Sequence, residues 1–334
     1  MSNQSQGLES KEAAAENNSS GASVTNSGLS TGERLEEKEN GVVTGEATGE
    51  PDYATGLRLI LIMITISISG LLTALEIGII ATAIPEITDK YHSINDVGWY
   101  GSATFLLAAA SSAMWGKMYK YMNVKHVYLA SMVFFLVGSV VAAAAPSSSA
   151  VIVGRALQGF GASGTMGGSI IVINYVAHPQ RHPLLIGIWM SIFMVSTILG
   201  PVVGGALTSG VSWRWCFWIN LPLGGPITVL LYFALYVPKH IKSIPATWKE
   251  IILQLDFPGF AMLLASLVCL ALALQRGGQT KAWDDASVIA TLVLWIVFTA
   301  GFVVVEWFQD SRAIFPLELL KPRMTWANAL YNFM

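Results

Sequence analysis

Residues 59–83 read LILIMITISISGLLTALEIGIIATA, and Glu76 is the single charged residue among them. The stretch exceeds the roughly 20 apolar residues that a helix needs to cross a hydrocarbon core of about 30 Å. Lipid offers the backbone no hydrogen-bond partner, and segments of this length suit helices rather than the roughly 10-residue strands of a barrel. Similar segments with few or no charges follow at about 97–116, 126–145, 150–174, 184–208, 214–237, 257–275 and 287–308. The sequence therefore predicts an all-α polytopic membrane protein with eight crossings.

Composition excludes several other classes of protein. Only 12% of the 334 residues are charged, about half of the roughly 25% usual for soluble domains. The formal net charge is -2 and no run of Lys and Arg occurs, so we expect no nucleic-acid partner. Cys216 and Cys269 each lie in an apolar stretch, and the five histidines share no metal-ligand spacing, so we expect no disulfide framework, metal or cofactor.

Residues 1–56 differ from the rest of the chain. They hold three basic and ten acidic residues and a single aromatic, Tyr53. A segment of this kind cannot bury enough apolar surface to offset the entropy of ordering, which predicts a disordered tail. It also lacks the basic start and apolar core of a signal peptide.

The distribution of basic residues predicts the orientation, because cytosolic loops carry an excess of Lys and Arg. One set of alternate loops holds ten basic residues, and the other set holds four. This bias places the amino terminus in the cytosol. The ten are Lys117, Lys120, Lys125, Arg181, Lys239, Lys242, Lys249, Arg312, Lys321 and Arg323, and the four are Lys90, Arg214, Arg276 and Lys281.

Glu76 and Arg155 are charged residues inside predicted crossings. A carboxylate at this depth is costly, so it either pairs across helices or takes up a proton. Arg155 is the partner that we predict for Glu76, because it follows a long uncharged stretch and stays charged at physiological pH. Two simpler interpretations remain: Glu76 could be a structural carboxyl bonded to a neighbouring helix, and Arg155 could extend to the lipid headgroups.

Glycines in two crossings favour close helix packing. Gly159, Gly161 and Gly164 match the G-x-G-x-x-G dinucleotide fingerprint, but that motif requires a strand followed by a helix in a soluble unit. Within one crossing, glycines instead provide flat surfaces for a neighbouring helix. The segment around Gly200 also contains Pro201, which removes a backbone hydrogen bond and favours a kink. Residues 57–334 contain no G-x-S-x-G sequence, and the whole chain contains no H-E-x-x-H or Walker A sequence, so we predict no enzyme or ATP-driven pump.

Five signatures occur in order along the chain, at residues 75–85, 116–125, 155–161, 200–205 and 213–222. Together they resemble the major facilitator superfamily, in its 14-helix drug:proton antiporter branch. Residues 75–85 (LEIGIIATAIP) resemble the signature of the first helix, and residues 116–125 resemble the loop between helices 2 and 3. Residues 155–161 (RALQGFG) resemble the fourth-helix motif R-x-x-Q-G-x-G, which the family links to proton transfer. Residues 200–205 (GPVVGG) match the fifth-helix antiporter motif, and residues 213–222 (WRWCFWINLP) match the start of helix 6. One departure is that the loop has Lys120 and Asn123 where the family has an acidic residue and a glycine.

The resemblance implies a domain organisation. Residues 57–237 would form the first six-helix bundle, and residues 238–256 a cytosolic loop. Residues 257–309 would form two additional helices inserted between the bundles, with a cytosolic loop and the start of a ninth helix at 310–334. The second bundle would then be missing from the sequence, so the chain looks truncated.

The function implied by the resemblance is proton-coupled efflux of a small organic molecule, by alternating access between two bundles. The substrate would be a toxin, drug or secondary metabolite of a fungus, and the protein would be a monomer in the plasma membrane, driven by the proton gradient without a cofactor. The residues carried over are Glu76, Arg155 and Gln158 for proton coupling, Gly200, Pro201, Gly204 and Gly205 as the bending element of the fifth helix, Gly116, Lys117 and Lys125 in the loop motif, and Trp213, Arg214 and Asn220 in the helix-6 motif.

Three alternatives stay open at this point. The chain could belong to an uptake or facilitated-diffusion carrier of the same superfamily. It could be a membrane receptor or scaffold, although such a protein would need neither a buried acid nor a kinked glycine helix. It could also lack transport activity because half of the translocation path is missing.

Overall fold

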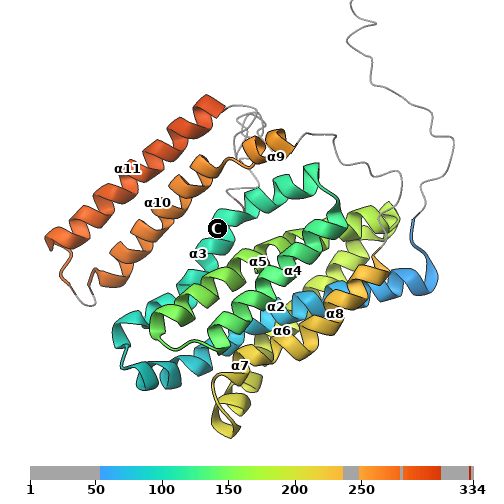
Figure 1. The fold of residues 1–334 in the computed structure, drawn as a ribbon, viewed down its shortest axis with the longest axis horizontal. Coiled ribbons are helices and arrows are strands. Elements are labelled where there is room, and N and C mark those ends of the chain that lie inside the picture. Colours follow the sequence, from blue (N-terminus) through green and yellow to red (C-terminus); the bar gives the residue numbers. More distant parts are fainter. Residues whose placement is uncertain (1–52, 236–247, 279–280, 310–330, 332–334) are drawn as a thin grey trace, which may run out of the picture. The chain divides into compact units, whose positions relative to one another are not determined.

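The computed structural model describes residues 53–235, 248–278 and 281–309 together with residue 331 (Figure 1). Most of the predicted tail, the loop residues 238–247 and the predicted start of a ninth helix lie outside these residues. The described chain consists of helices and connecting turns, without a β-strand. The helices are α2 (Gly56–Tyr91), α3 (Val97–Tyr121), α4 (Val124–Ala143), α5 (Ser148–Val176), α6 (His182–Gly210), α7 (Trp215–Trp218), α8 (Asn220–Ala234), α9 (Trp248–Gln254), α10 (Phe257–Arg276) and α11 (Ala286–Gln309), with the short 3-10 helices η1 (Ile94–Asp96) and η2 (Pro179–Arg181).

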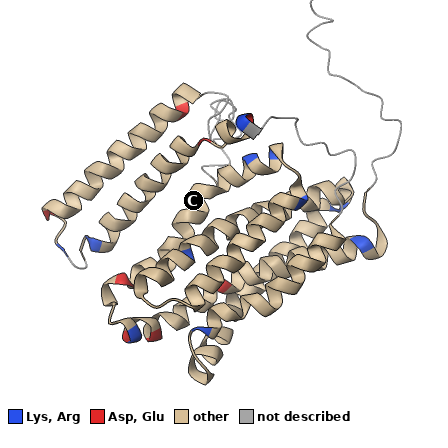
Figure 2. Ribbon diagram, viewed as in Figure 1, with Lys and Arg blue, Asp and Glu red and all other residues tan. Residues whose placement is uncertain are grey.

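Seven helical segments of the described chain are long and apolar enough to cross a membrane, with α7 and α8 together forming one of them (Trp215–Ala234). Figure 2 shows that charged residues gather near helix ends, while most of the helix length carries none. The prediction of an all-α multi-pass membrane protein is therefore confirmed. The predicted crossing at residues 97–116 also forms a continuous helix, α3, but this helix is not one of the seven apolar segments. Its share of Gly, Ser and Tyr and its two lysines lower its hydropathy.

Two helix boundaries differ from the predicted segments. The first helix continues to Tyr91 with Pro85 inside it, well past residue 83. The missing N–H of a proline removes only one bond of the helical ladder, and the left-handed residue His92 (φ 51°) ends the helix, its N–H bonded to the Thr88 carbonyl. The sixth segment is divided at Ile219 into the short α7 and the longer α8.

The glycines of α5 lie against α3 and α4. A Cβ at Gly159 would lie 2.1 Å from the carbonyl oxygen of Thr104 in α3, and one at Gly161 would lie 2.3 Å from the backbone nitrogen of Phe135 in α4. A Cβ at Gly164 would meet Trp115 and Ser131. Glycine therefore lets these backbones approach closely. This confirms that the G-x-G-x-x-G match serves helix packing and is no dinucleotide fingerprint.

Helices α2 and α6 pack through glycines in the same way. A Cβ at Gly200 would lie 2.6 Å from the Cα of Gly78, and a Cβ at Gly204 would lie 2.3 Å from the hydroxyl of Thr82. The Cδ of Pro201 also borders Gly78. Gly205 faces open space instead. The antiporter motif therefore provides the contact surface of α6 for α2.

We predict that Gly200→Ala destabilises the protein and that Gly205→Ala does not. The added methyl of Gly200→Ala meets backbone atoms, and such overpacking costs about 1–3 kcal/mol. The matched change Gly205→Ala adds a methyl in open space and improves helix propensity by up to about 1 kcal/mol. The measurement is the apparent melting temperature of the purified protein in detergent. Equal melting temperatures for the two variants would contradict the close packing of α2 and α6.

Candidate functional site

The site is centred on a buried ion pair between α2 and α5. The Nη1 of Arg155 donates to the Oε1 of Glu76 at 2.5 Å, and the two side chains are 1% and 2% exposed. The Nε of Arg155 donates to the Tyr100 carbonyl of α3 at 3.0 Å. The structure thus forms the predicted pair. Arg155 does not extend to the headgroups, because its charge is met inside the helix bundle.

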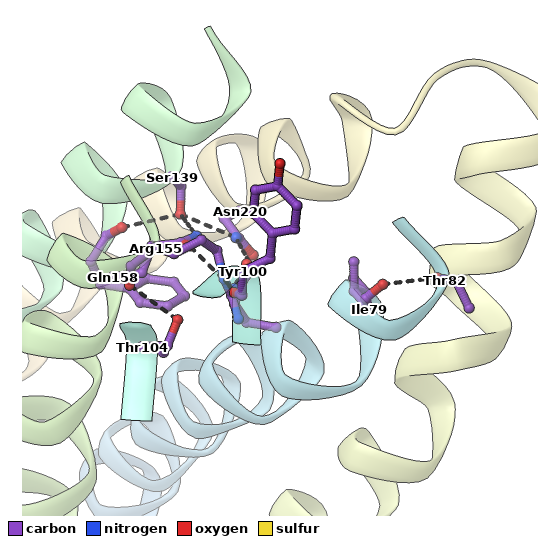
Figure 3. A network of polar contacts seen from close by, with 10 residues as sticks. Ile79, Thr82, Tyr100, Thr104, Ser139, Arg155, Gln158 and Asn220 are labelled. Carbon is purple, nitrogen blue, oxygen red and sulfur yellow. Dashed lines mark hydrogen bonds and ion pairs between the residues drawn. The ribbon is translucent and has the colours of Figure 1, made fainter. Parts of the chain in front are cut away.

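Three neutral polar side chains complete the hydrogen-bond network, and Figure 3 shows Ser139, Gln158 and Asn220 close to Arg155. The Nδ2 of Asn220 donates to the Oε2 of Glu76 at 2.7 Å and to the Ser139 hydroxyl at 3.1 Å. Gln158 accepts from the Arg155 Nη1 at 3.2 Å and donates to Ser139 at 2.9 Å. Side chains from α2, α4, α5 and α8 and a carbonyl of α3 therefore meet at one point.

Both oxygens of Glu76 thus have a hydrogen-bond donor, one charged and one neutral. A buried ion pair is costly to form, but removing one partner alone typically costs about 3–5 kcal/mol because it leaves an uncompensated charge. The carboxylate can bind a proton, whereas the guanidinium stays charged. The arrangement can therefore switch between an ion pair and a neutral acid beside a cation.

We predict that Arg155→Leu strongly destabilises the protein and that adding Glu76→Gln restores much of the loss. The single variant buries a carboxylate without a counter-charge, while the double variant contains neither charge. Apparent melting temperatures of the two single variants and of the double variant form a double-mutant cycle. Additive effects of the two substitutions would show that the charges do not interact.

The helix-6 motif is divided between two places. Asn220 joins the Glu76 network, whereas Arg214 binds the end of α4: it donates to the carbonyl oxygens of Ala143 and Ala145, the latter at 2.8 Å. Its guanidinium also lies 5.0 Å from the centre of the buried Trp213 ring. A cation at a helix C-terminus pairs with unbonded carbonyls and the negative end of the helix dipole. Arg214 therefore anchors α7 to the end of α4, and the Trp213 ring lies against Tyr91 at the end of α2.

The loop motif lies apart from the Glu76 network. Gly116 has open space around it. The half-buried Lys117 is attracted by the carboxylates of Asp256 and Glu306, which belong to the segment of α10 and α11. The Nζ of Lys125 lies 4.4 Å from the centre of the Tyr232 ring. Asn123, at the position where the family has glycine, accepts from the Lys125 N–H and caps α4.

The antiporter motif reaches α2 beside the site without touching the carboxyl of Glu76. Gly200 packs on Gly78, which lies two residues beyond Glu76 on the same helix. Of the four predicted residues of this motif, Gly205 makes no such contact. The bending of α6 stays a prediction.

Sequence reasoning missed two features of the site. Ser139 joins Gln158 to Asn220, and nothing in its local sequence distinguishes it from other membrane serines. Thr65, Ser69 and Thr73 are also buried, and each donates to a carbonyl one turn earlier in α2. Their four-residue spacing leads to Glu76 along one helix face and could have been found. Within the described residues, no group of three or more His, Cys, Asp or Glu side chains could hold a metal ion.

Comparison with known proteins identifies the class. A model of the Major Facilitator Superfamily matches residues 66–320, and the chain belongs to this family. That places it among membrane transporters rather than enzymes.

Two curated relatives are similar over most of the chain. The "Dehydrocurvularin exporter" of Alternaria cinerariae is 68% identical over 301 residues, which cover 90% of this chain and 52% of that protein. The "Efflux pump notK" of Aspergillus sp. (strain MF297-2) is 64% identical over 285 residues, which cover 85% and 51%. The chain thus spans about half the length of the curated relatives it matches. Among solved structures, the human organic anion transporter MFSD10 (TETRAN) is 13% identical with a TM-score of 0.48, over 78% of this chain and 74% of that one.

Proposed function

We propose that the full-length protein exports a small organic secondary metabolite from a fungal cell in exchange for protons. The observation that carries the proposal is the buried pair of Glu76 and Arg155, bonded to α8 through Asn220. A titratable acid enclosed by several helices is expensive in a membrane, and proton relays are a main use of such a group.

Proton binding would change how firmly the helices are held together. While Glu76 is ionised, its two oxygens hold Arg155 of α5 and Asn220 of α8. Protonation removes the negative charge, which weakens the pair with Arg155 and leaves one oxygen a hydrogen-bond donor. A ligand shifts a conformational equilibrium only if it binds one conformation more tightly than the other. The proton would bind more tightly to the conformation in which Glu76 is held less firmly by Arg155 and Asn220, and would therefore favour that conformation.

The substrate class and the direction of transport rest on the relatives. Proteins 68% and 64% identical to this chain are named as an exporter and an efflux pump. The compound in the first name, dehydrocurvularin, is therefore a suitable first probe. We also propose a plasma-membrane location, a cytosolic amino terminus and a monomeric transporter. The basic residues of alternate loops support the orientation.

We predict that Glu76→Gln abolishes proton-driven transport. Full-length protein reconstituted in lipid vesicles should accumulate dehydrocurvularin when the vesicle lumen is more acidic than the medium, because exchange moves substrate towards the acidic side. Glutamine keeps the size of the side chain but cannot release a proton, so accumulation should fall at least tenfold, to the level of protein-free vesicles. Exchange of labelled for unlabelled substrate without a gradient should persist.

The matched control is Glu86→Gln, which removes an exposed carboxylate of the same helix and should leave accumulation unchanged. Undiminished accumulation by Glu76→Gln would remove Glu76 from the mechanism. Accumulation towards the alkaline side would indicate proton-coupled uptake instead of antiport. Equilibration without accumulation would indicate facilitated diffusion.

A further inference from the structure

Asn220 carries a bonding pattern that the pairing of Glu76 with Arg155 does not explain. We propose that Asn220 is a positioning residue that senses the proton on Glu76 by turning its side-chain amide and passes the change to α8; this inference rests on the proton coupling proposed above. It assigns a specific role to an asparagine that the sequence marks only as part of a motif.

The two ends of the amide have unequal surroundings. Asn220 is fully buried. Its Nδ2 donates both to the Oε2 of Glu76 and to the hydroxyl of Ser139. Its Oδ1 is buried without a hydrogen-bond partner among the described residues. An amide oxygen can accept two hydrogen bonds, so the present orientation uses the donor end of the side chain and leaves the acceptor end unused.

The protonation state of Glu76 decides which end is favoured. A carboxylate only accepts hydrogen bonds, so it requires the Nδ2. A protonated carboxyl has an O–H that donates, and half a turn of the amide about its Cβ–Cγ bond would present the Oδ1 to it. The proton stays on Glu76 throughout this rotation. The Ser139 hydroxyl now donates its hydrogen to the Phe135 carbonyl and accepts from Nδ2. It fits the second state if it turns that hydrogen from the Phe135 carbonyl to Oδ1, because a hydroxyl can both donate and accept.

The other groups around Asn220 do not favour one orientation of its amide over the other, so the protonation state of Glu76 determines the orientation. In either orientation one end of the amide faces Glu76 and Ser139, and the other end faces the position where the Oδ1 now has no partner. Among the described residues, the charged group that acts on Glu76 is Arg155 of α5, and the charge of Glu76 in turn acts on the Cys216 thiol of α7. The other elements contribute uncharged groups: Ser139 of α4, the carbonyl of Tyr100 in α3, and the glycine surface of α6.

Asn220 is also placed where a change in its bonds can move a helix. It is the first residue of α8, directly after the turn at Ile219 that separates α8 from α7. Pro222 has no N–H to bond to the carbonyl of Trp218, so the ladder between the two helices is interrupted. Because Arg214 anchors α7 to α4, the rotation would act on α8 while α7 stays in place.

Infrared difference spectroscopy tests this inference without a transport substrate. The purified full-length transporter in lipid nanodiscs, with its asparagines labelled by carbon-13 at the side-chain carbonyl, is titrated with protons. The carboxyl band of Glu76 is assigned by its loss in Glu76→Gln, and the amide band of Asn220 by its loss in Asn220→Thr. We expect both bands to change at the same pH in the wild-type protein, because one event drives both.

Variants separate sensing from support of the fold. Asn220→Leu removes the donor to the carboxylate, so the carboxyl midpoint should move to higher pH by about one unit or more, as expected for one lost bond to a charged group. Asn220→Thr, whose hydroxyl can donate or accept, should restore part of this shift. The matched control Ser139→Ala removes the other partner of Asn220 but keeps the bond to Glu76, so it should move the midpoint less than Asn220→Leu.

The outcomes distinguish this inference from the proposed function. An amide band that stays constant while the Glu76 carboxyl titrates would overturn the sensing role of Asn220 and leave proton exchange intact. A Glu76 carboxyl that does not titrate would overturn both. Because the wild-type spectra and the Asn220→Thr variant decide the question, a failure of Asn220→Leu to fold would not prevent the test.

Discussion

The ion pair between Glu76 and Arg155 is the interaction on which the described structure depends. Two opposite charges in an apolar bundle are tolerated only when each is paired and its remaining hydrogen-bonding groups are satisfied. Meeting that requirement brings α2, α5 and α8 to one point, with Ser139 of α4 and the Tyr100 carbonyl of α3 beside them. A site that needs groups from five helices holds those helices in register.

Close approach of the backbones makes this convergence possible. Gly159 lets α5 lie against α3, and Gly138 lets α4 lie against Gln158 of α5. On the other side of α2, Gly78 and Gly200 bring α6 next to the turn that carries Glu76. Side chains at these positions would separate the helices, and the short polar side chains could no longer reach each other. The glycines and the ion pair are therefore two parts of one arrangement, in which packing sets the distances and charge sets the partners.

Sequence reasoning succeeded where a strong general constraint acts on a short segment. Hydrophobic length predicted the helices, and the cost of a charge in lipid predicted that Glu76 would find Arg155, 79 positions away in the chain. It missed Ser139, because a membrane serine commonly bonds a carbonyl of its own helix. Only the packing of the neighbouring helices shows which serine also bonds side chains of other helices. It also did not predict the turn at Ile219, since the apolar pattern continues through that position.

The sequence by itself determined that this is a helical membrane protein, which charges lie in its apolar part, and which family signatures it carries. These properties follow from the composition of single segments against a solvent of fixed thickness and polarity. Only the tertiary structure decided which atoms meet: that Asn220 donates to Glu76 while Arg214, six positions earlier, binds the end of α4. A hydrogen bond between two helices forms only when the donor and acceptor distance is right to within a few tenths of an ångström. Packing, not local sequence, determines that distance.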